Sequence, residues 1–202
     1  MTWNLVSKAR FGLFYVVFVT IILEKVNAST FVREATGRPR STSVFSLCTQ
    51  GRGQEGRSTM NILTYACQVS ISPPFWGISL YKGTQSHANM MSDKVGVLAL
   101  LPEKFNLDAV KVLGNESGKD VDKEARLRHL GVPVEKVEVE GAGALTVPSE
   151  ASQLIVLRVD ESKPVVDVGD HDFFMCSPVA YYASSSQYSA LTTRHLREFG
   201  II

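Results

Sequence analysis

The side chains best suited to chemistry lie in one short polar stretch, Lys82-Gly83-Thr84-Gln85-Ser86-His87, which follows an apolar segment. The stretch offers one or two cations, two hydroxyl groups and free backbone N–H groups within six residues. A phosphate monoester needs charge-assisted donors from several directions, and a turn that runs into a helix N-terminus supplies them. The residues therefore indicate a phosphoryl-binding site, and the alternative is a polar turn that is only solvated.

Two further loops carry polar groups, and no common catalytic motif accompanies them. Gly114-Asn115-Glu116-Ser117-Gly118 could turn backbone N–H groups toward an anion. Asp170 and Asp172 flank His171, but adjacent turn positions rarely converge on one substrate, so we assign these carboxylates no acid–base role. The sequence has neither a Gly-x-Gly-x-x-Gly after a strand nor a Walker-type Gly-Lys-Ser/Thr, and it has no nucleophile elbow.

Composition predicts one globular domain and excludes several classes of partner. The 202 residues are 45% hydrophobic and 20% charged, which is a globular balance. A net charge of +1 gives no field for a polyanion, so we expect no nucleic-acid partner. The cysteines and histidines lack metal-ligand or disulfide spacings. We expect Cys67 and Cys176 to be small buried apolar residues.

The pattern of apolar residues predicts a mainly β fold. Residues 61–80 are rich in β-branched and aromatic side chains, and Ser72-Pro73-Pro74 divides them into two strands joined by a stiff turn. The continuous apolar run at 95–101, ended by Pro102, predicts a fully buried strand. Short β-rich segments suited to a barrel or sandwich follow at 134–139, 154–159, 164–168 and 173–179.

Helices are expected between the strands. The chain favours a helix start at 84–91, short helices at 106–113 and 121–130, and a C-terminal helix at 189–198. The fold class that follows is mainly β with helices (α+β).

Three segments in a fixed order carry a family resemblance. The first comprises Asn61-Ile62-Leu63-Thr64-Tyr65-Ala66, Val69-Ser70-Ile71-Ser72-Pro73-Pro74 and Leu80-Tyr81-Lys82-Gly83-Thr84. The second is Leu113-Gly114-Asn115-Glu116-Ser117-Gly118 with Asp122-Lys123, and the third is Gly169-Asp170-His171. Together, over roughly residues 59–200, they resemble the flavin reductase-like FMN-binding domain family, whose fold is a flavoredoxin-type split β-barrel. Met175-Cys176-Ser177-Pro178-Val179 departs from the Gly-Glu-Val common in that family, on the nicotinamide side of the expected site.

The resemblance implies a set of FMN-binding positions. The flavin ring would lie along Asn61, Thr64, Tyr65 and Ala66, with backbone donors near Val69 and Ser70. The phosphate would be held by Lys82, Gly83, Thr84, Ser86 and His87. The central loop would bring Ser117 and Lys123 toward the flavin, and His171, the one candidate catalytic residue, would border the nicotinamide side.

The resemblance also implies the activity of an NAD(P)H:flavin oxidoreductase, which passes hydride from NAD(P)H to FMN. FAD is less favoured than FMN as the cofactor. One alternative is an FMN-binding electron carrier between protein partners that does not oxidise nicotinamide. Another is a barrel without flavin that serves a structural or haem-handling role, against which the intact 82–87 cluster argues. Relatives build the flavin pocket partly from a second subunit, so the resemblance implies a homodimer.

The N-terminal residues are typical of targeting sequences rather than of a folded domain. Lys8 and Arg10 precede an uncharged run at 11–23, and Val26-Asn27-Ala28 suits signal peptidase. Residues 1–28 therefore predict a signal peptide, with a membrane anchor as the alternative, although the run is short for a span. Residues 29–57 are Ser-, Thr- and Arg-rich with few acidic residues, so we expect a transit-peptide-like segment that is removed or disordered, and a folded domain at 58–202. Both segments resemble the bipartite presequence of algae with secondary plastids, which implies a plastid (chloroplast) location and no stable membrane anchor after processing. The alternative location is secreted or endomembrane.

Overall fold

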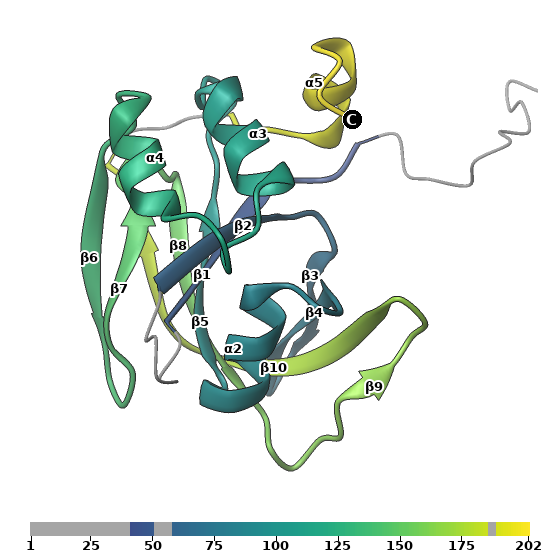
Figure 1. Cartoon of the computed structure of the whole chain (residues 1–202). Helices are drawn as coiled ribbons and strands as arrows, with labels where there is room; N and C mark the ends of the chain where they lie inside the picture. Colours follow the sequence, from purple (N-terminus) through teal and green to yellow (C-terminus); the bar gives the residue numbers. More distant parts are fainter. Residues whose placement is uncertain (1–40, 51–57, 186–188) are drawn as a thin grey trace, which may run out of the picture. The chain divides into compact units, whose positions relative to one another are not determined.

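The computed structural model describes residues 41–50, 58–185 and 189–202 (Figure 1). The predicted signal peptide and the first part of the transit-peptide-like segment, up to residue 40, lie outside these described residues. Across the described ranges, no helix combines the length and apolar character needed to cross a membrane.

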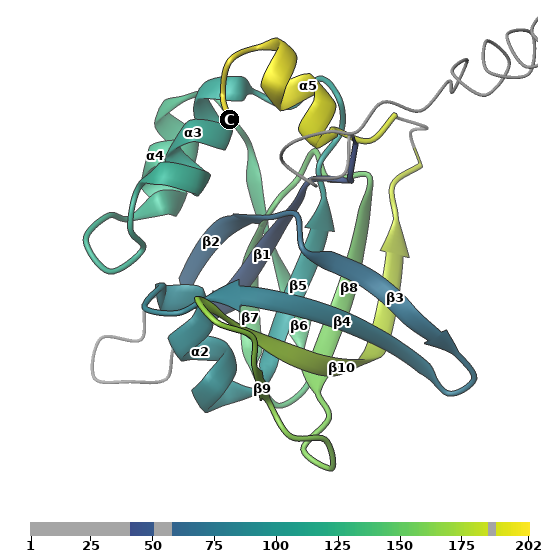
Figure 2. The same ribbon diagram turned by 90° about the vertical axis from the view of Figure 1, so that its right-hand side faces the viewer.

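The main structural element is an antiparallel sheet with the strand order β2-β1-β5-β8-β10-β4-β3, and β9 pairs with β10 (Figure 2). Its strands are β1 (Phe45–Gln50), β2 (Ser58–Leu63), β3 (Ala66–Ile71), β4 (Pro74–Tyr81), β5 (Val95–Leu100), β8 (Gln153–Val159), β9 (Val166–Asp167) and β10 (His171–Ala183). A separate hairpin consists of β6 (Val134–Val139) and β7 (Gly143–Pro148). The prediction of a mainly β fold with helices is confirmed.

The middle strands of this sheet are buried on both faces. In β5, Val97 and Ala99 belong to one hydrophobic cluster, whereas Leu98 belongs to a second cluster. Successive side chains of a strand point to opposite faces, so a strand between two cores must be apolar throughout. The continuous apolar run that predicted a buried strand at 95–101 is confirmed by β5 and by the burial of Leu101.

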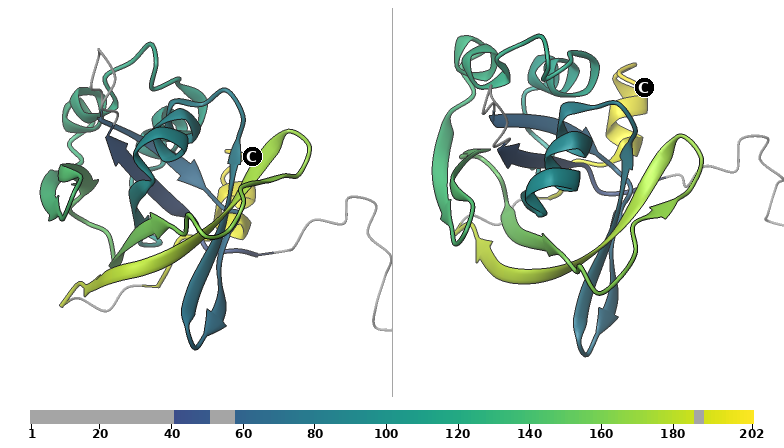
Figure 3. Two further views of the ribbon diagram at one scale, coloured as in Figure 1. Left: turned by 90° about the horizontal axis from the view of Figure 1, so that it is seen from below. Right: turned by 60° about the horizontal axis from the view of Figure 1, so that its bottom comes forward.

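Helices cover both cores, and polar caps define where the helices begin. The first cluster includes side chains of α3 (Leu107–Asn115), α4 (Lys123–His129) and α5 (Thr193–Glu198), and the second includes Met90 of α2 (Gln85–Asp93). Figure 3 shows α2 beside β1 and β2. Buried Asn89 fixes this contact because its side-chain amide donates to the Thr49 hydroxyl at 3.0 Å. Each helix has a capping residue whose side chain accepts a backbone N–H, namely Thr84, Asn106, Asp122 and Thr192.

The predicted start of the folded domain at residue 58 is wrong. β1 lies within the segment that we expected to be removed or disordered, yet it pairs with both β2 and β5. Val44 and Leu47 are fully buried, in different cores. The prediction rested on the average composition of residues 29–57, which is rich in Ser, Thr and Arg, and it therefore missed the six residues of β1 within that segment.

Other boundaries also differ from the sequence-based expectations. The first expected strand is two strands, β2 and β3, because the chain turns at Thr64-Tyr65, and the β7 strand was not predicted at all. The C-terminal helix begins only at Thr193, after the Thr192 cap.

The prediction for the cysteines is half right. Cys176 is buried as expected, but Cys67 is exposed because β3 is the edge strand of the sheet. Burial raises the thiol pKa of Cys48 and of Cys176 to about 12.

Candidate functional site

A pocket of about 550 Å³ lies among β2, the end of β4, the start of α2 and the loop between α3 and α4. It collects ten of the fourteen predicted site residues from distant parts of the chain: Asn61, Thr64, Tyr65, Lys82, Gly83, Thr84, Ser86, Ser117, Lys123 and His171. The other four, Ala66, Val69, Ser70 and His87, do not line the pocket. Their role in binding, like that of the ten, stays a prediction.

The pocket is elongated along β2. Thr59 near the start of this strand and Leu63 at its end both line the pocket, and four residues of strand span roughly 13 Å. At the corner after β2 the chain joins β4, because Ser79 donates its backbone N–H to the Tyr65 carbonyl at 2.9 Å. The cavity can therefore hold a long ligand with chemically different ends.

Aromatic rings line the Tyr65 end of the pocket. The His171 ring meets the rings of Tyr65 and Tyr81 edge-on, with centroid distances of 5.4 and 5.5 Å. His171 Nδ1 also lies 2.7 Å from a carboxylate oxygen of Asp170, a hydrogen bond that lowers the Asp170 pKa. Tyr65 and Tyr81 are more than half exposed, so this end is open to a flat partner.

The other end is formed by close packing of the central loop against β2 and α2. A Cβ atom on Gly118 would overlap the Thr59 hydroxyl and would lie 3.4 Å from the Gln85 Cβ. A side chain at 118 would therefore have to displace the Thr59 side chain or move the loop. Ser86, which is 2% exposed, adds a hydroxyl group at the start of α2.

The N-terminus of α2 presents backbone donors to the pocket. Gly83 has a φ of +87°, which favours glycine and turns the chain into the helix. The Thr84 hydroxyl donates to the Tyr81 carbonyl at 2.9 Å and accepts from the His87 N–H at 3.2 Å, so it acts as the helix cap. Among the described residues no acceptor is found for the N–H groups of Gln85 and Ser86, which leaves them to a ligand.

Lys82 is engaged in a polar cluster with the β9–β10 turn. Its ammonium lies 2.8 Å from an Asp167 oxygen and 3.5 Å from an Asp172 oxygen, and it donates to the Gly169 carbonyl at 2.8 Å. The hydrogen bond with Asp167 raises the Lys82 pKa. His87 points into the same cluster, with its Nε2 2.7 Å from Asp172.

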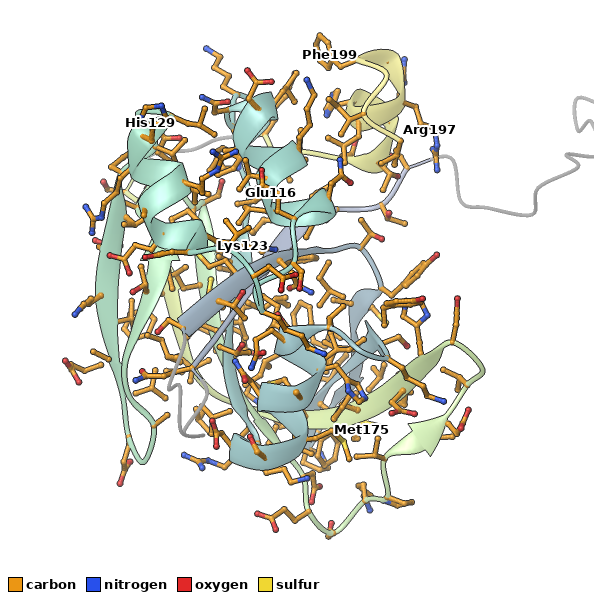
Figure 4. All side chains as sticks on the ribbon, in the orientation of Figure 1. Glu116, Lys123, His129, Met175, Arg197 and Phe199 are labelled. Carbon is orange, nitrogen blue, oxygen red and sulfur yellow. The ribbon has the colours of Figure 1, made fainter. Side chains whose placement is uncertain are left out.

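Lys123 begins α4 and is 3% exposed, although it carries an ammonium group. Its Nζ donates to the Leu113 carbonyl at the end of α3 at 2.7 Å. Burial lowers its pKa to about 8, and the negative charge of Glu116 offsets part of that effect. Figure 4 shows Lys123 and Glu116 near the facing ends of α4 and α3.

Asn61 provides a test of whether a heterocycle fits the pocket. Its Oδ1 is buried and finds no hydrogen-bond partner within the described part of the chain. A buried acceptor without a partner costs about 1–3 kcal/mol, and a ligand N–H in the pocket would remove that cost. The residues present thus fit a flat ring with polar edges.

Several pocket residues were missed by the sequence analysis, including Thr59, Ser79, Gln85 and Gly118. Thr59 and Gln85 stand within a few residues of the recognised motifs, but nothing in the sequence shows that Gly118 packs on them. No group of acidic, histidine and cysteine side chains suited to a metal ion occurs at positions 41–50, 58–185 or 189–202.

The comparison with protein families agrees with this geometry. Residues 39–200 match the model of the flavin reductase like domain. The chain belongs to this family. The flavin reductase family binds flavins and catalyses oxidoreduction, so the chain is a flavin-binding oxidoreductase in general terms. A comparison with curated protein sequences gives no significant match.

Solved structures of flavin reductase-like proteins share the split-barrel fold. Flavoredoxin from Methanosarcina acetivorans is 18% identical with a TM-score of 0.63, covering 78% of this chain and 77% of its own. An NADH:FAD oxidoreductase from Streptomyces globisporus is 16% identical with a TM-score of 0.61, covering 77% of this chain and 82% of its own. An FMN-binding protein from Thermus thermophilus, with bound 1-cyclohex-2-enone, is 19% identical with a TM-score of 0.59, covering 78% of both chains. These neighbours confirm the fold class, an open-sheet split barrel.

Proposed function

We propose that the protein binds FMN in the pocket along β2 and passes hydride from NAD(P)H to it. The observation that carries the proposal is the unpartnered Asn61 Oδ1 in an elongated cavity that has aromatic rings at one end and backbone N–H donors at the other. FMN has matching parts, a heterocycle with N–H groups and a phosphate tail. The neighbours named as FMN-binding and NADH:FAD proteins support a flavin and a nicotinamide as the two small molecules.

When bound, FMN supplies the two-electron chemistry, and the side chains place and polarise it. Asn61 would hold the heterocycle through its unpartnered Oδ1, and the free N–H groups at the α2 N-terminus would hold the phosphate. Tyr65, Tyr81 and His171 form an open aromatic border where a nicotinamide ring can lie. Asp170 orients the His171 ring through its hydrogen bond.

The full chain tests this proposal directly. The purified protein should bind FMN, seen as quenching of flavin fluorescence, and should oxidise NADH or NADPH only when FMN is present. An Asn61→Leu variant, similar in size but without the acceptor, should bind FMN about 10-fold more weakly, because one hydrogen bond to a buried group is lost. A protein that binds no added flavin would contradict the proposal.

The electron-carrier alternative makes a different prediction. The carrier, like the reductase, binds FMN, but its bound flavin is not reduced by nicotinamide. Stopped-flow mixing of the FMN-loaded protein with NADH or NADPH separates the two functions. Loss of the flavin absorbance indicates the reductase, and an unchanged spectrum indicates the carrier.

We also propose that a second copy of the chain packs against the part of the sheet formed by β3 and β10, where Val69 and Ile71 of β3 and Val179 and Tyr181 of β10 are exposed apolar side chains. Each of these side chains is at least 46% exposed, and large apolar groups left in water favour association.

Light scattering on a sizing column tests the homodimer. The wild type should have the mass of two chains, and Ile71→Asp should have the mass of one. Phe199→Asp is the matched control, because Phe199 is also exposed but lies just after the end of α5, away from β3 (Figure 4). A wild type with the mass of one chain would refute the dimer.

For the N-terminus we propose delivery to a plastid, supported by the signal-peptide pattern and the basic, hydroxylated stretch that follows it. Because β1 begins at Phe45, the removable segment must end before that residue. Residues 1–40 fused to a fluorescent protein should enter the plastid of an alga with secondary plastids. Deletion of residues 29–40 should divert the fusion to secretion, and secretion of the intact fusion would contradict the proposal.

A further inference from the structure

Three carboxylates lie close together at the β9–β10 turn, which comprises residues 168–170. Asp167 ends β9, Asp170 belongs to the turn, and Asp172 is the second residue of β10. Like charges so near one another repel, so a cation among them stabilises the turn. His171 directly follows the turn and lines the pocket, and the place of its ring therefore depends on how the turn is held.

Lys82, the residue after the end of β4, supplies that cation. Its ammonium lies 2.8 Å from an Asp167 oxygen and 3.5 Å from an Asp172 oxygen, and it donates to the Gly169 carbonyl at 2.8 Å. An ammonium has three N–H groups, and each has an acceptor among these atoms. The Lys82 backbone N–H also donates to the Asp170 carbonyl at 3.0 Å. One residue thus ties the turn to β4 through both its side chain and its backbone.

Hydrogen bonds inside the turn connect Asp167 to the backbone of His171. The Gly169 N–H donates to one Asp167 oxygen at 2.9 Å, and the Val168 N–H donates to the His171 carbonyl at 3.0 Å. The second Asp167 oxygen is the one that pairs with Lys82. A movement of Asp167 away from Lys82 would therefore displace the backbone that carries His171.

We propose that Lys82 and Asp167 are positioning residues, which together hold His171 in place at the open aromatic end of the pocket. The inference rests on the proposed function, in which a nicotinamide ring lies at this end. The His171 ring meets the rings of Tyr65 and Tyr81 edge-on, so a small shift of the turn changes the surface that the nicotinamide contacts. Lys82 then acts through the turn and not as a charge that attracts an anionic ligand.

Two substitutions separate these roles of Lys82, because both break the ion pair but they change the local charge in opposite directions. Lys82→Met removes a positive charge. Asp167→Asn removes a negative charge, and its amide oxygen can still accept the Gly169 N–H. If Lys82 acts through the turn, both substitutions should slow the reduction of bound flavin. If Lys82 attracts an anion, Asp167→Asn should instead free its ammonium and strengthen ligand binding.

Stopped-flow mixing of the FMN-loaded full chain with NADH or NADPH measures the limiting rate of flavin reduction. This rate should fall about 10-fold in Lys82→Met and in Asp167→Asn, because misplacement by about 1 Å can cost up to about 100-fold, whereas FMN affinity should stay within about twofold. Lys82→Arg should restore most of the rate, since it keeps the charge and the donors. In a chain that carries His171→Ala, Lys82→Met should slow the reduction no further, because Lys82 acts through His171.

Hydrogen exchange of the ligand-free chain tests the turn without any flavin chemistry. The Val168 N–H should exchange about 3- to 10-fold faster in Lys82→Met and in Asp167→Asn, as expected for the loss of an exposed ion pair. Asp160→Asn is the matched control and should leave this exchange unchanged. The Asp160 carboxylate likewise accepts a backbone N–H two residues further on, that of Ser162 at 2.9 Å, but its other partner is the Ser162 hydroxyl rather than a lysine.

The results distinguish failure of the inference from failure of the proposed function. A bound flavin that neither nicotinamide reduces refutes the proposed function, and hydrogen exchange still decides whether Lys82 and Asp167 hold the turn. Tighter ligand binding in Asp167→Asn, or unchanged exchange in both variants, would overturn the inference. So would further slowing by Lys82→Met in the chain that carries His171→Ala. The Asp167 side chain is 75% exposed, so Asp167→Asn should fold even if Lys82→Met does not.

Discussion

The buried ammonium of Lys123 should make the stability of the ligand-free protein depend on pH in an unusual direction. Burial lowers its pKa from 10.5 to about 8, so the folded protein holds this proton less tightly than the unfolded chain does. Between these two pH values the unfolded state binds more protons, and the free energy of unfolding therefore rises with pH. Below pH 8 both states are protonated, and the full cost of the buried charge is present.

The size of this change in stability follows from the shift of the Lys123 pKa. A lowering of roughly 2.5 pH units, at 1.36 kcal/mol per unit, corresponds to about 3 kcal/mol, and the side chain is buried enough for most of this to apply. Lys123→Met removes the charge but keeps an unbranched side chain of similar length. The free energy of unfolding of the wild type minus that of Lys123→Met should thus increase by about 3 kcal/mol from pH 7.5 to 10.5.

Urea unfolding followed by circular dichroism, at several pH values and with flavin removed, measures this difference. Flavin must be absent because a ligand bound only to the folded state adds its own stabilisation. Loss of the hydrogen bond to Leu113 adds an offset that does not vary with pH. Lys111→Met is the matched control, since its ammonium is exposed and its removal leaves the contribution of Lys123 in place. Parallel stability curves for the wild type and Lys123→Met would refute the reasoning.

Two further predictions concern the central loop and the start of the domain. Gly118→Ala should lower the free energy of unfolding by about 1–3 kcal/mol and weaken FMN binding, because the new Cβ overlaps the Thr59 hydroxyl. Gly114→Ala is the control and should change neither quantity, because a Cβ atom there would lie 3.7 Å from its nearest neighbour. Equal effects of the two substitutions in urea unfolding and FMN titration would contradict the packing argument. A chain of residues 58–202 should not fold, because it lacks β1 from the middle of the sheet, whereas Arg40–Ile202 should melt cooperatively when followed by circular dichroism. Cooperative melting of the shorter chain would show that β1 is dispensable.

The strands and helices that the sequence predicted well are those with a strong local cause. The apolar run that became β5 had to be buried on both faces, and Pro102 ends it. Asp122 begins α4 because its carboxylate accepts the Ala125 N–H at 3.0 Å. β1 was missed because its neighbours in the sequence are polar, and only its pairing with β2 and β5 accounts for its burial.

In the candidate site, too, features with a local cause were predicted and features that depend on distant residues were not. The family motifs indicated most of the pocket residues, since backbone turns and polar clusters are visible in a sequence. They suggested Lys82 as the phosphate cation because it stands next to Thr84 and Ser86. The structure shows that Asp167 and Asp172, some 85 to 90 residues further along the chain, already engage its ammonium.

The mainly β class, the family and the segments that form the pocket can be read from the amino-acid sequence, because these depend on local preferences and on motifs in a fixed order. Which charged side chains are paired and which are buried follows only from the folded arrangement. Whether an ammonium is paired or buried depends on groups that folding brings together from distant segments, as it does with Asp167 and Lys82. Lys123 is an ordinary first-turn residue of a helix in the sequence, and it becomes a buried cation only when α3, α4 and β2 pack around it.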